Sequence, residues 1–149
     1  MPVTELALTD LYATDETAWL DEMAELLRRG AFAELDHRHL REYLTDMANR
    51  DRREVESRLV VLLAHVLKWL YQPDHRSRSW RGTIVAQRHE LARLIGRGVL
   101  RNHATVVLGE AYREAIERAT AETDLPAETF PPECGYTLDE LLAFDPTAV

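Results

Sequence analysis

Apolar side chains recur along this chain at the three- and four-residue intervals of an amphipathic helix, and no stretch alternates as a half-buried strand does. The first clear run predicts a helix over residues 15–29, with an apolar face of Trp19, Leu20, Met23, Leu26 and Leu27. Thr14 is the expected N-cap, because its hydroxyl can accept a hydrogen bond from the first turn. Gly30 is the expected end, because glycine readily adopts the left-handed conformation that closes helices.

Two further helices are expected before Pro73. One begins near Asp36 and carries Leu40, Tyr43, Leu44 and Met47 on one face; Asn49 is its expected left-handed stop. Asp51 is then the expected cap of a central helix over residues 51–72, and Pro73 ends it because proline cannot continue a helix. That helix has a wide apolar stripe, which predicts that other helices cover it: Val55, Leu59, Leu62, Leu63, Val66, Leu67 and Leu70.

A fourth helix is expected after Ser79 and is broken by Gly96 and Gly98, and a fifth runs over about residues 100–123. A proline-rich stretch follows, and Thr137 with Glu140 has the spacing of a capping box at the start of a short final helix. The sequence therefore predicts an all-α protein, a compact bundle of about five helices plus a Pro-rich C-terminal tail with a short helix. We expect one domain over residues 1–149, with a core over about 11–123 and the tail 124–149 packed on it.

Composition and charge narrow the function classes. Apolar residues make up 46% of the 149, enough for a substantial core, and the longest apolar run is too interrupted for a membrane span. The start of the chain shows no secretory signal, and Cys134 is the only cysteine, so we expect a cytoplasmic, bacterial or organellar, protein. The net charge of −8 argues against general nucleic-acid binding, but residues 65–101 alone carry +6.

The densest stretch of polar and aromatic residues runs from Leu63 to Ile84, across the junction of the third and fourth helices. Ser77 or Ser79 is expected to cap the fourth helix, leaving backbone N–H groups free near several arginine forks. Such an arrangement can bind an anion. The candidate binding residues for an anion or a partner are His65, Lys68, Arg76, Ser77, Arg78, Ser79, Arg81 and Arg88.

This stretch, together with Leu11-Tyr12, Trp19 and the segment from Phe130 to Leu138, resembles the domain-of-unknown-function family numbered twenty-nine, common in cyanobacteria and proteobacteria. The resemblance covers about residues 11–142. It rests mainly on the central motif: His65, Lys68, Trp69, Tyr71, Gln72, Pro73, Arg76, Ser77, Ser79 and Trp80. It implies a compact all-helical fold, and it implies no activity and no catalytic or binding residues.

The same motif has a purely structural interpretation, which the residue types favour. Trp69 and Trp80 are typical core residues, and a histidine on an apolar helix is more often a satisfied buried group than a catalyst. The arginines at 76, 78 and 81 are then expected to pair with carboxylates elsewhere in the chain, above all those of the acidic C-terminal stretch.

Signals for catalysis or metal binding are weak. Asp36, His39 and Glu42 share a helical face, but a bundle metal site needs such a pattern twice, so we expect no metal and no other cofactor. Cys134 has no neighbouring base in the sequence, and the Arg97–His103 spacing is only loosely similar to that of helical ribonucleases.

We therefore expect a non-catalytic helical module that binds a protein partner or associates with itself. The alternative is nucleic-acid or anion binding through the basic segment 65–101, with Lys68, Arg76, Arg78, Arg81 and Arg88 as the contacts. An enzyme is the third hypothesis. No membrane contact is expected.

Overall fold

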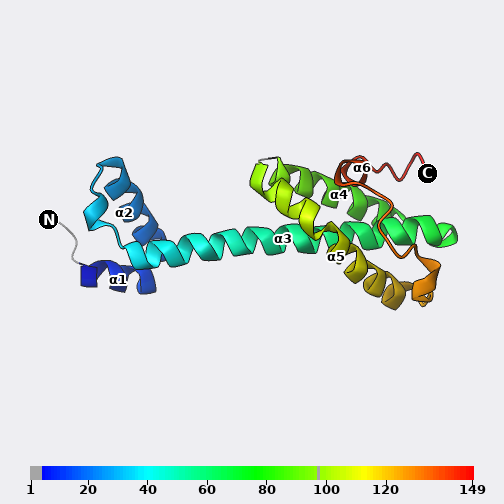
Figure 1. Ribbon diagram of the computed structural model, residues 1–149, viewed down its shortest axis with the longest axis horizontal. Helices are drawn as coiled ribbons and strands as arrows, with labels where there is room; N and C mark the ends of the chain where they lie inside the picture. The colour runs from blue at the N-terminus through cyan, green and yellow to red at the C-terminus, as the bar shows by residue number, and fades with distance from the viewer. Residues whose placement is uncertain (1–4, 97) are drawn as a thin grey trace. The chain divides into compact units, whose positions relative to one another are not determined.

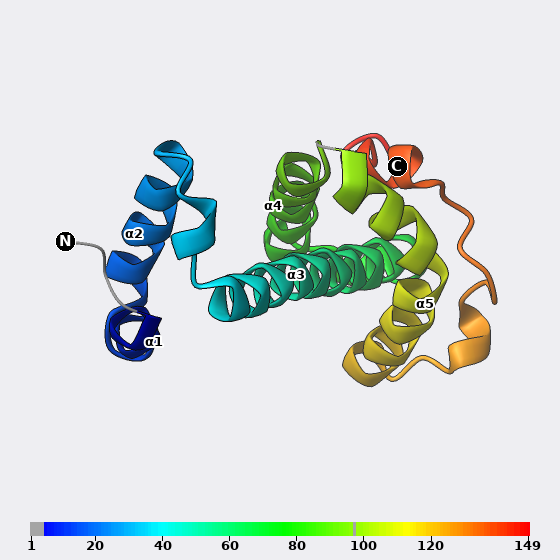
Figure 2. The same ribbon diagram turned by 60° about the vertical axis from the view of Figure 1, so that its left-hand side comes forward.

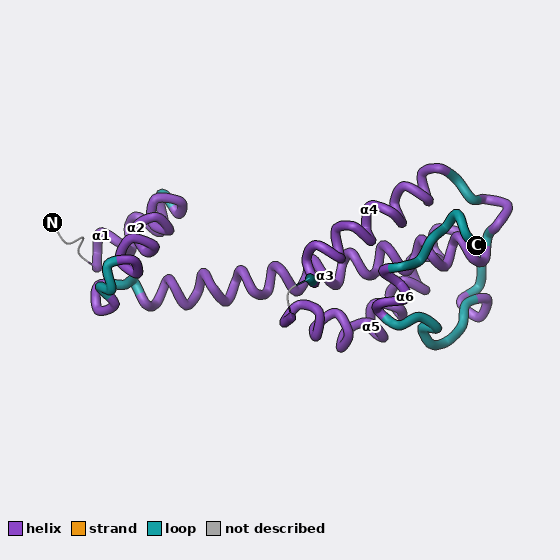
Figure 3. The backbone as a smooth tube through the Cα atoms, turned by 90° about the horizontal axis from the view of Figure 1, so that it is seen from above, coloured by secondary structure: helices purple, strands orange, loops and turns teal. Residues whose placement is uncertain are grey.

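The computed structural model describes residues 5–96 and 98–149. Two parts of the chain lie outside these ranges, Met1–Thr4 and Arg97. The expectation about a signal segment rests partly on Met1–Thr4. The described residues form helices and turns and no strand, which confirms the all-α prediction (Figures 1 and 3). The six α-helices in these ranges are α1 (Glu5–Thr14), α2 (Glu16–Arg28), α3 (His37–Tyr71), α4 (Arg78–Ile95), α5 (Gly98–Thr123) and α6 (Leu138–Leu142).

Contacts along the backbone divide the chain into two compact units, unit 1 (Met1–Asn49) and unit 2 (Arg50–Val149), and α3 contributes residues to both. The expected single domain over residues 1–149 stays a prediction. None of the described helices combines the length and the apolar character that crossing a membrane requires.

Unit 1 is built from α1, α2, a short 3-10 turn (Phe32–Glu34) and the beginning of α3. In its described part the fully buried side chains are Leu8, Trp19, Met23 and Leu26, with other apolar residues packed around them. The sequence pattern did not predict α1, because the segment is short and its apolar residues do not gather on one helical face. Contact with α2 gives this short segment the tertiary support that an isolated helix of ten residues lacks.

The existence of α1 corrects the predicted cap of α2. Thr14 is the last residue of α1, where its hydroxyl donates to the carbonyl of Asp10 at 2.8 Å. Asp15 caps α2 instead, its carboxylate accepting a hydrogen bond from the Ala18 amide at 3.0 Å. The expected glycine stop is confirmed, since Gly30 adopts a φ of +70° immediately after the helix.

The predicted break at Asn49 and the predicted new cap at Asp51 are wrong. One helix, α3, continues through both positions for 35 residues. Among the described non-glycine residues only Asp124 has a positive φ, so Asn49 does not adopt the left-handed conformation that a stop would need. Asparagine and aspartate are only mildly unfavourable inside a helix, and the arginines and glutamate that follow are good helix formers.

Unit 2 packs α4 and α5 against the C-terminal half of α3 (Figure 2). α4 runs back antiparallel to α3, and α6 packs against both α4 and α5. The apolar stripe predicted for the central helix is the core of this unit, with Val55, Leu59 and Leu62 fully buried. Small residues line the inner face of α5 and bring it close to α3: Ala104, Ala111, Ala115 and Ala119.

The junctions of unit 2 follow the sequence signals closely. Pro73 opens a 3-10 turn (Pro73–His75) after α3, and α4 ends at Ile95 before Gly96. The capping box of α6 is confirmed, with hydrogen bonds running both ways between Thr137 and Glu140. α4 begins at Arg78, two residues before the start expected after Ser79, because Ser77 is its cap.

The two central tryptophans differ in burial, which gives a test of the packing. Trp69 is 4% exposed, whereas Trp80 is half-buried against the same core. We expect Trp69→Ala to lower the free energy of unfolding by ~3–5 kcal/mol, because it leaves a cavity in the core. Trp80→Ala should cost clearly less. Urea unfolding of both variants measures this, and equal losses would contradict the packing described.

Candidate functional site

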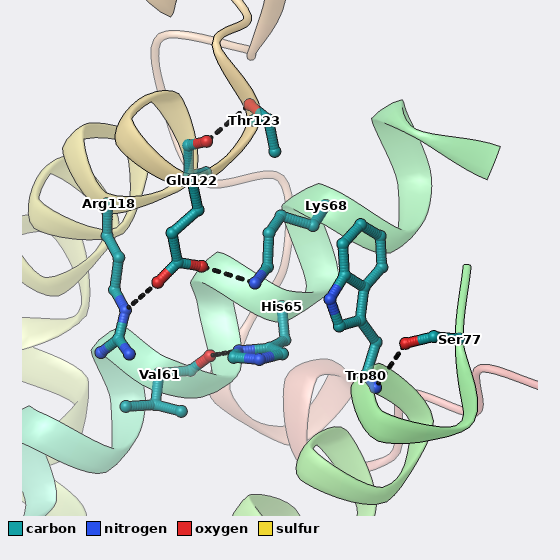
Figure 4. A network of polar contacts seen from close by, with 9 residues as sticks. Val61, His65, Lys68, Ser77, Trp80, Arg118, Glu122 and Thr123 are labelled. Carbon is teal, nitrogen blue, oxygen red and sulfur yellow. Dashed lines mark hydrogen bonds and ion pairs between the residues drawn. The ribbon is translucent and has the colours of Figure 1, made fainter. Parts of the chain in front are cut away.

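The motif at the junction of α3 and α4 is organised around Lys68, a lysine only 5% exposed. Its ammonium lies 2.5 Å from the carboxylate of Glu122, near the end of α5, and 4.9 Å from the centre of the Trp80 ring (Figure 4). A buried ammonium is costly unless it is paired, and here a carboxylate and an aromatic face replace its hydration. Lys68 thus joins three helices in one contact.

Glu122 is held from two sides. Arg118, one turn earlier on α5, donates from Nε to the second carboxylate oxygen at 2.9 Å. Burial alone raises the pKa of Glu122, but the hydrogen bonds from Lys68 and Arg118 outweigh it, so the pKa is lowered from its usual value. The carboxylate is therefore ionised at neutral pH and satisfied within the protein.

His65 lies one turn before Lys68 on α3 and is half-buried. Its Nδ1 is 2.8 Å from the carbonyl oxygen of Val61 (Figure 4). Because a carbonyl can only accept, Nδ1 carries the proton of the neutral ring. Burial is the largest cause that lowers the pKa of His65, the Val61 bond opposes it, and the Lys68 charge lowers it further. The imidazole is neutral at pH 7.

Arg76 is used inside the structure. Its guanidinium lies 4.9 Å from the centre of the Trp69 ring, its Nε donates to the Trp69 carbonyl at 2.8 Å, and one terminal nitrogen donates to the main-chain oxygen of Val149 at 3.0 Å. Arg88 likewise donates to the carbonyl of Phe144. Both arginines tie helices of unit 2 to the C-terminal segment.

The expected pairing of Arg76, Arg78 or Arg81 with an Asp or Glu side chain is not found within the described residues. The C-terminal segment does reach Arg76, but the atom that accepts from its guanidinium is the main-chain oxygen of Val149. The acidic tail residue that does pair is Asp139, and its partner is Arg101 of α5. The charge pattern of the sequence identified the acidic segment correctly but not the basic side chains it meets.

Of the two candidate caps, Ser77 is the one used, its hydroxyl accepting from the Trp80 amide at 3.1 Å. Ser79 is exposed on the first turn of α4, and so are Arg78 and Arg81. The eight candidate residues thus separate into two groups. His65, Lys68, Arg76, Ser77 and Arg88 have internal partners, whereas Arg78, Ser79 and Arg81 face solvent.

Unit 1 contains a second polar cluster that the sequence only hinted at. Asp36, directly before α3, is 6% exposed, and its carboxylate accepts from Trp19 Nε1 at 3.1 Å and lies 2.8 Å from Nδ1 of His39. The Tyr12 ring stacks on the His39 ring at a centroid distance of 4.4 Å. Burial by itself raises the pKa of Asp36, but the hydrogen bonds from His39 and Trp19 outweigh burial. The pKa of Asp36 is therefore lowered from its usual value, and the carboxylate is ionised at neutral pH.

The Asp36–His39 spacing was visible as part of the weak metal triplet with Glu42. Among the described residues, no group of three or more His, Cys, Asp or Glu side chains is placed to hold a metal ion. The signal for this cluster is a tryptophan whose indole N–H needs an acceptor together with an aspartate before a helix. The two residues, Trp19 and Asp36, are 17 positions apart, so the sequence alone does not show that they meet.

Two other chemical candidates have structural partners. Cys134 is half-buried, its thiol donates to the carbonyl of Tyr136 at 3.4 Å, and burial raises its pKa. A thiol with a raised pKa is a poor nucleophile. His103 lies 2.9 Å from Glu56 of α3, while Arg97, the other member of the ribonuclease-like spacing, lies outside the described residues.

A family model for the domain of unknown function DUF29 matches residues 11–145 of the chain. No curated protein matches the chain. No solved structure matches it either.

The buried ion pair predicts an asymmetry between its two partners. Glu122→Gln leaves the Lys68 ammonium buried without a counter-charge, whereas Lys68→Met keeps the apolar stem and leaves Glu122 paired with Arg118. We expect Glu122→Gln to cost about 1–3 kcal/mol of unfolding free energy, toward the lower end because Glu122 is partly exposed, and Lys68→Met to cost less. Chemical denaturation measures both, and Arg118→Gln is the control, expected near zero.

His65 predicts a pH dependence. Its folded pKa lies below the unfolded value near 6.5, so the unfolded chain binds the proton more readily. The stability contribution is complete above pH 6.5 and is lost as pH falls from there through the folded pKa. Denaturation midpoints measured between pH 8 and pH 5 should fall less steeply for His65→Gln than for the parent chain. Parallel curves would show that His65 titrates normally.

Proposed function

We propose that this chain, which belongs to the DUF29 family, is a non-catalytic helical module that binds a protein partner through unit 1. The observation that carries the proposal is the exposure of three large apolar side chains in that unit. Leu27 is 47% exposed, Phe32 61% and Leu44 59%.

These exposures are informative because the sequence pattern places two of the residues on inner faces. Leu27 follows Met23 and Leu26 on the apolar face of α2, and Leu44 follows Leu40 and Tyr43 on that of α3. Unit 1 buries or half-buries the other members of each stripe and leaves Leu27 and Leu44 exposed. Fully burying a side chain of this size contributes ~1.5–3 kcal/mol, and a partner that covers these partly exposed positions would gain roughly half of that at each.

Charge indicates what kind of partner fits. Unit 1 has four arginines against eleven acidic residues, a formal net charge of −7. Two copies of this surface would repel each other, which disfavours symmetric self-association through unit 1. The complementary surface is a protein patch with apolar residues at its centre and lysines or arginines around them.

The main polar clusters support a non-catalytic module. The hydrogen bonds of Lys68 and Glu122 in unit 2, and those of Asp36 in unit 1, are made to other side chains of the same unit. Networks satisfied in this way favour one unique packing of the helices.

The test compares two double variants of the full chain. Phe32→Ser with Leu44→Ser removes two exposed apolar side chains of unit 1. Val99→Ser with Val106→Ser removes two from α5, where they are 76% and 80% exposed. Used as baits in lysate of the source cell, the parent and the valine variant should retain the same protein. The Phe32/Leu44 variant should retain it at least roughly tenfold less, with unchanged circular dichroism.

Three results would overturn the proposal. One is a set of retained proteins that does not differ between the two double variants, and another is a parent bait that retains nothing above background. The third is a parent chain whose mass in light scattering doubles with concentration and reverts to monomer only in the Phe32/Leu44 variant. That result would make a second copy the occupant.

The alternative function, anion or nucleic-acid binding, is favoured by the exposure of Arg78 and Arg81 on the first turn of α4. Of the five contacts expected for this function, Lys68, Arg76 and Arg88 have internal partners, which leaves this surface small. Retention of the parent chain on heparin that falls steeply with salt would favour it over a protein partner.

A further inference from the structure

Unit 2 contains a cavity of about 330 Å³ that none of the interactions above uses. One wall is the C-terminal part of α3, with Leu63, Val66 and Leu67 among its lining residues. These three side chains are at most 5% exposed, so this wall is part of the packed core. Cavities of this size and apolar character are typical of small-molecule sites.

The opposite wall consists of Tyr112 of α5 and the segment between α5 and α6, with Pro131, Gly135 and Tyr136. This segment, orange in Figure 1, passes the last turns of α3 on its way to α6. The Tyr112 hydroxyl donates to the Pro131 carbonyl at 2.6 Å. This bond fixes the segment over α5 and so forms the wall.

The lining has two other tyrosines, Tyr71 and Tyr136, whose hydroxyls do not bond to the segment as that of Tyr112 does. Tyr71 packs edge-on against Phe130, and Tyr136 packs edge-on against Phe144, so both rings are held in place. Neither hydroxyl has a hydrogen-bond partner among the described residues. Tyr71 is 37% exposed and Tyr136 half-buried, so both hydroxyls can donate either to water or to a bound molecule.

The lining has no charged side chain. Burial is the main cause that raises the pKa of Tyr112 to about 12, and burial also raises the pKa of Tyr136. Nearby Cys134 and Tyr71 raise both values further. The phenols of Tyr112 and Tyr136 therefore stay protonated at neutral pH. An ionised ligand would lose its hydration here and gain no counter-charge.

We propose that this cavity binds a small neutral molecule of one or two rings that presents a hydrogen-bond-accepting oxygen, such as a carbonyl, to the hydroxyls of Tyr71 and Tyr136. The apolar wall of α3 accommodates the rings. Because the lining has no cationic side chain, the site favours an uncharged acceptor over a carboxylate.

Three probes of the same ring system separate these features: acetylnaphthalene, ethylnaphthalene and naphthoate, substituted at the same ring position. Binding to the full chain is followed by NMR through the methyl groups of Leu63, Val66 and Leu67. Acetylnaphthalene should shift these methyls and bind roughly tenfold more tightly than ethylnaphthalene, because only the former accepts a hydrogen bond. Naphthoate should bind more weakly than acetylnaphthalene by at least about the same factor.

Matched variants locate the hydroxyl contacts. Tyr136→Phe and Tyr71→Phe keep the rings, so they should reduce acetylnaphthalene affinity several-fold, and up to about tenfold when combined, while leaving ethylnaphthalene binding unchanged. Tyr43→Phe in unit 1 is the control and should change neither. Leu70→Trp, at a half-buried lining position, should abolish binding of both while the thermal transition persists.

The proposal is overturned if no probe shifts the lining methyls, or if ethylnaphthalene or naphthoate binds as tightly as acetylnaphthalene. It is also overturned if affinity for acetylnaphthalene is the same in the two phenylalanine variants and the parent. None of these results depends on the surface residues of unit 1, so the protein-binding proposal stands or fails separately.

Discussion

The buried ammonium of Lys68 is the constraint on which the packing of unit 2 depends. A lysine in this position is tolerable only if a carboxylate and an aromatic face reach it, and those groups come from α5 and α4. The ion pair with Glu122 brings the end of α5 to α3, and the Trp80 ring brings the start of α4 to the same point. The register of three helices is therefore linked to one charge, although most of the stabilising free energy comes from the apolar core.

The C-terminal segment is held by hydrogen bonds to its main chain rather than by an ion pair, and two of the donors are arginine guanidinium groups. Arg76 and Arg88 donate to the main-chain oxygens of Val149 and Phe144, and Tyr112 donates to that of Pro131. An irregular segment has carbonyls that no helix satisfies, and these long donors supply the missing partners. The same segment completes a wall of the apolar cavity, so the bonds that fix it also define that site.

Much of the fold could be predicted from local sequence signals, and the two main misses have separate causes. The apolar stripe of α3, the Ser77 cap, the Gly30 stop and the capping box of α6 are local signals, and the structure has each of them. The break at Asn49 failed because a cap-like residue is only a weak preference that helical neighbours override. The helix α1 was missed because its stability depends on contact with α2 rather than on its own pattern.

The sequence by itself determined the helical class, most helix ends and the polar composition of the junction motif, because capping and amphipathicity act within one or two turns. Only the tertiary structure decided which charges meet. Lys68 pairs with Glu122, 54 positions away, and Arg101 pairs with Asp139, 38 positions away. The carboxylate of Asp36 contacts the indole of Trp19 and the imidazole of His39. The net charge of a segment shows only that opposite charges are present. Whether an arginine meets a side-chain carboxylate or a main-chain oxygen depends on the distances between these groups, which only the packed helices set.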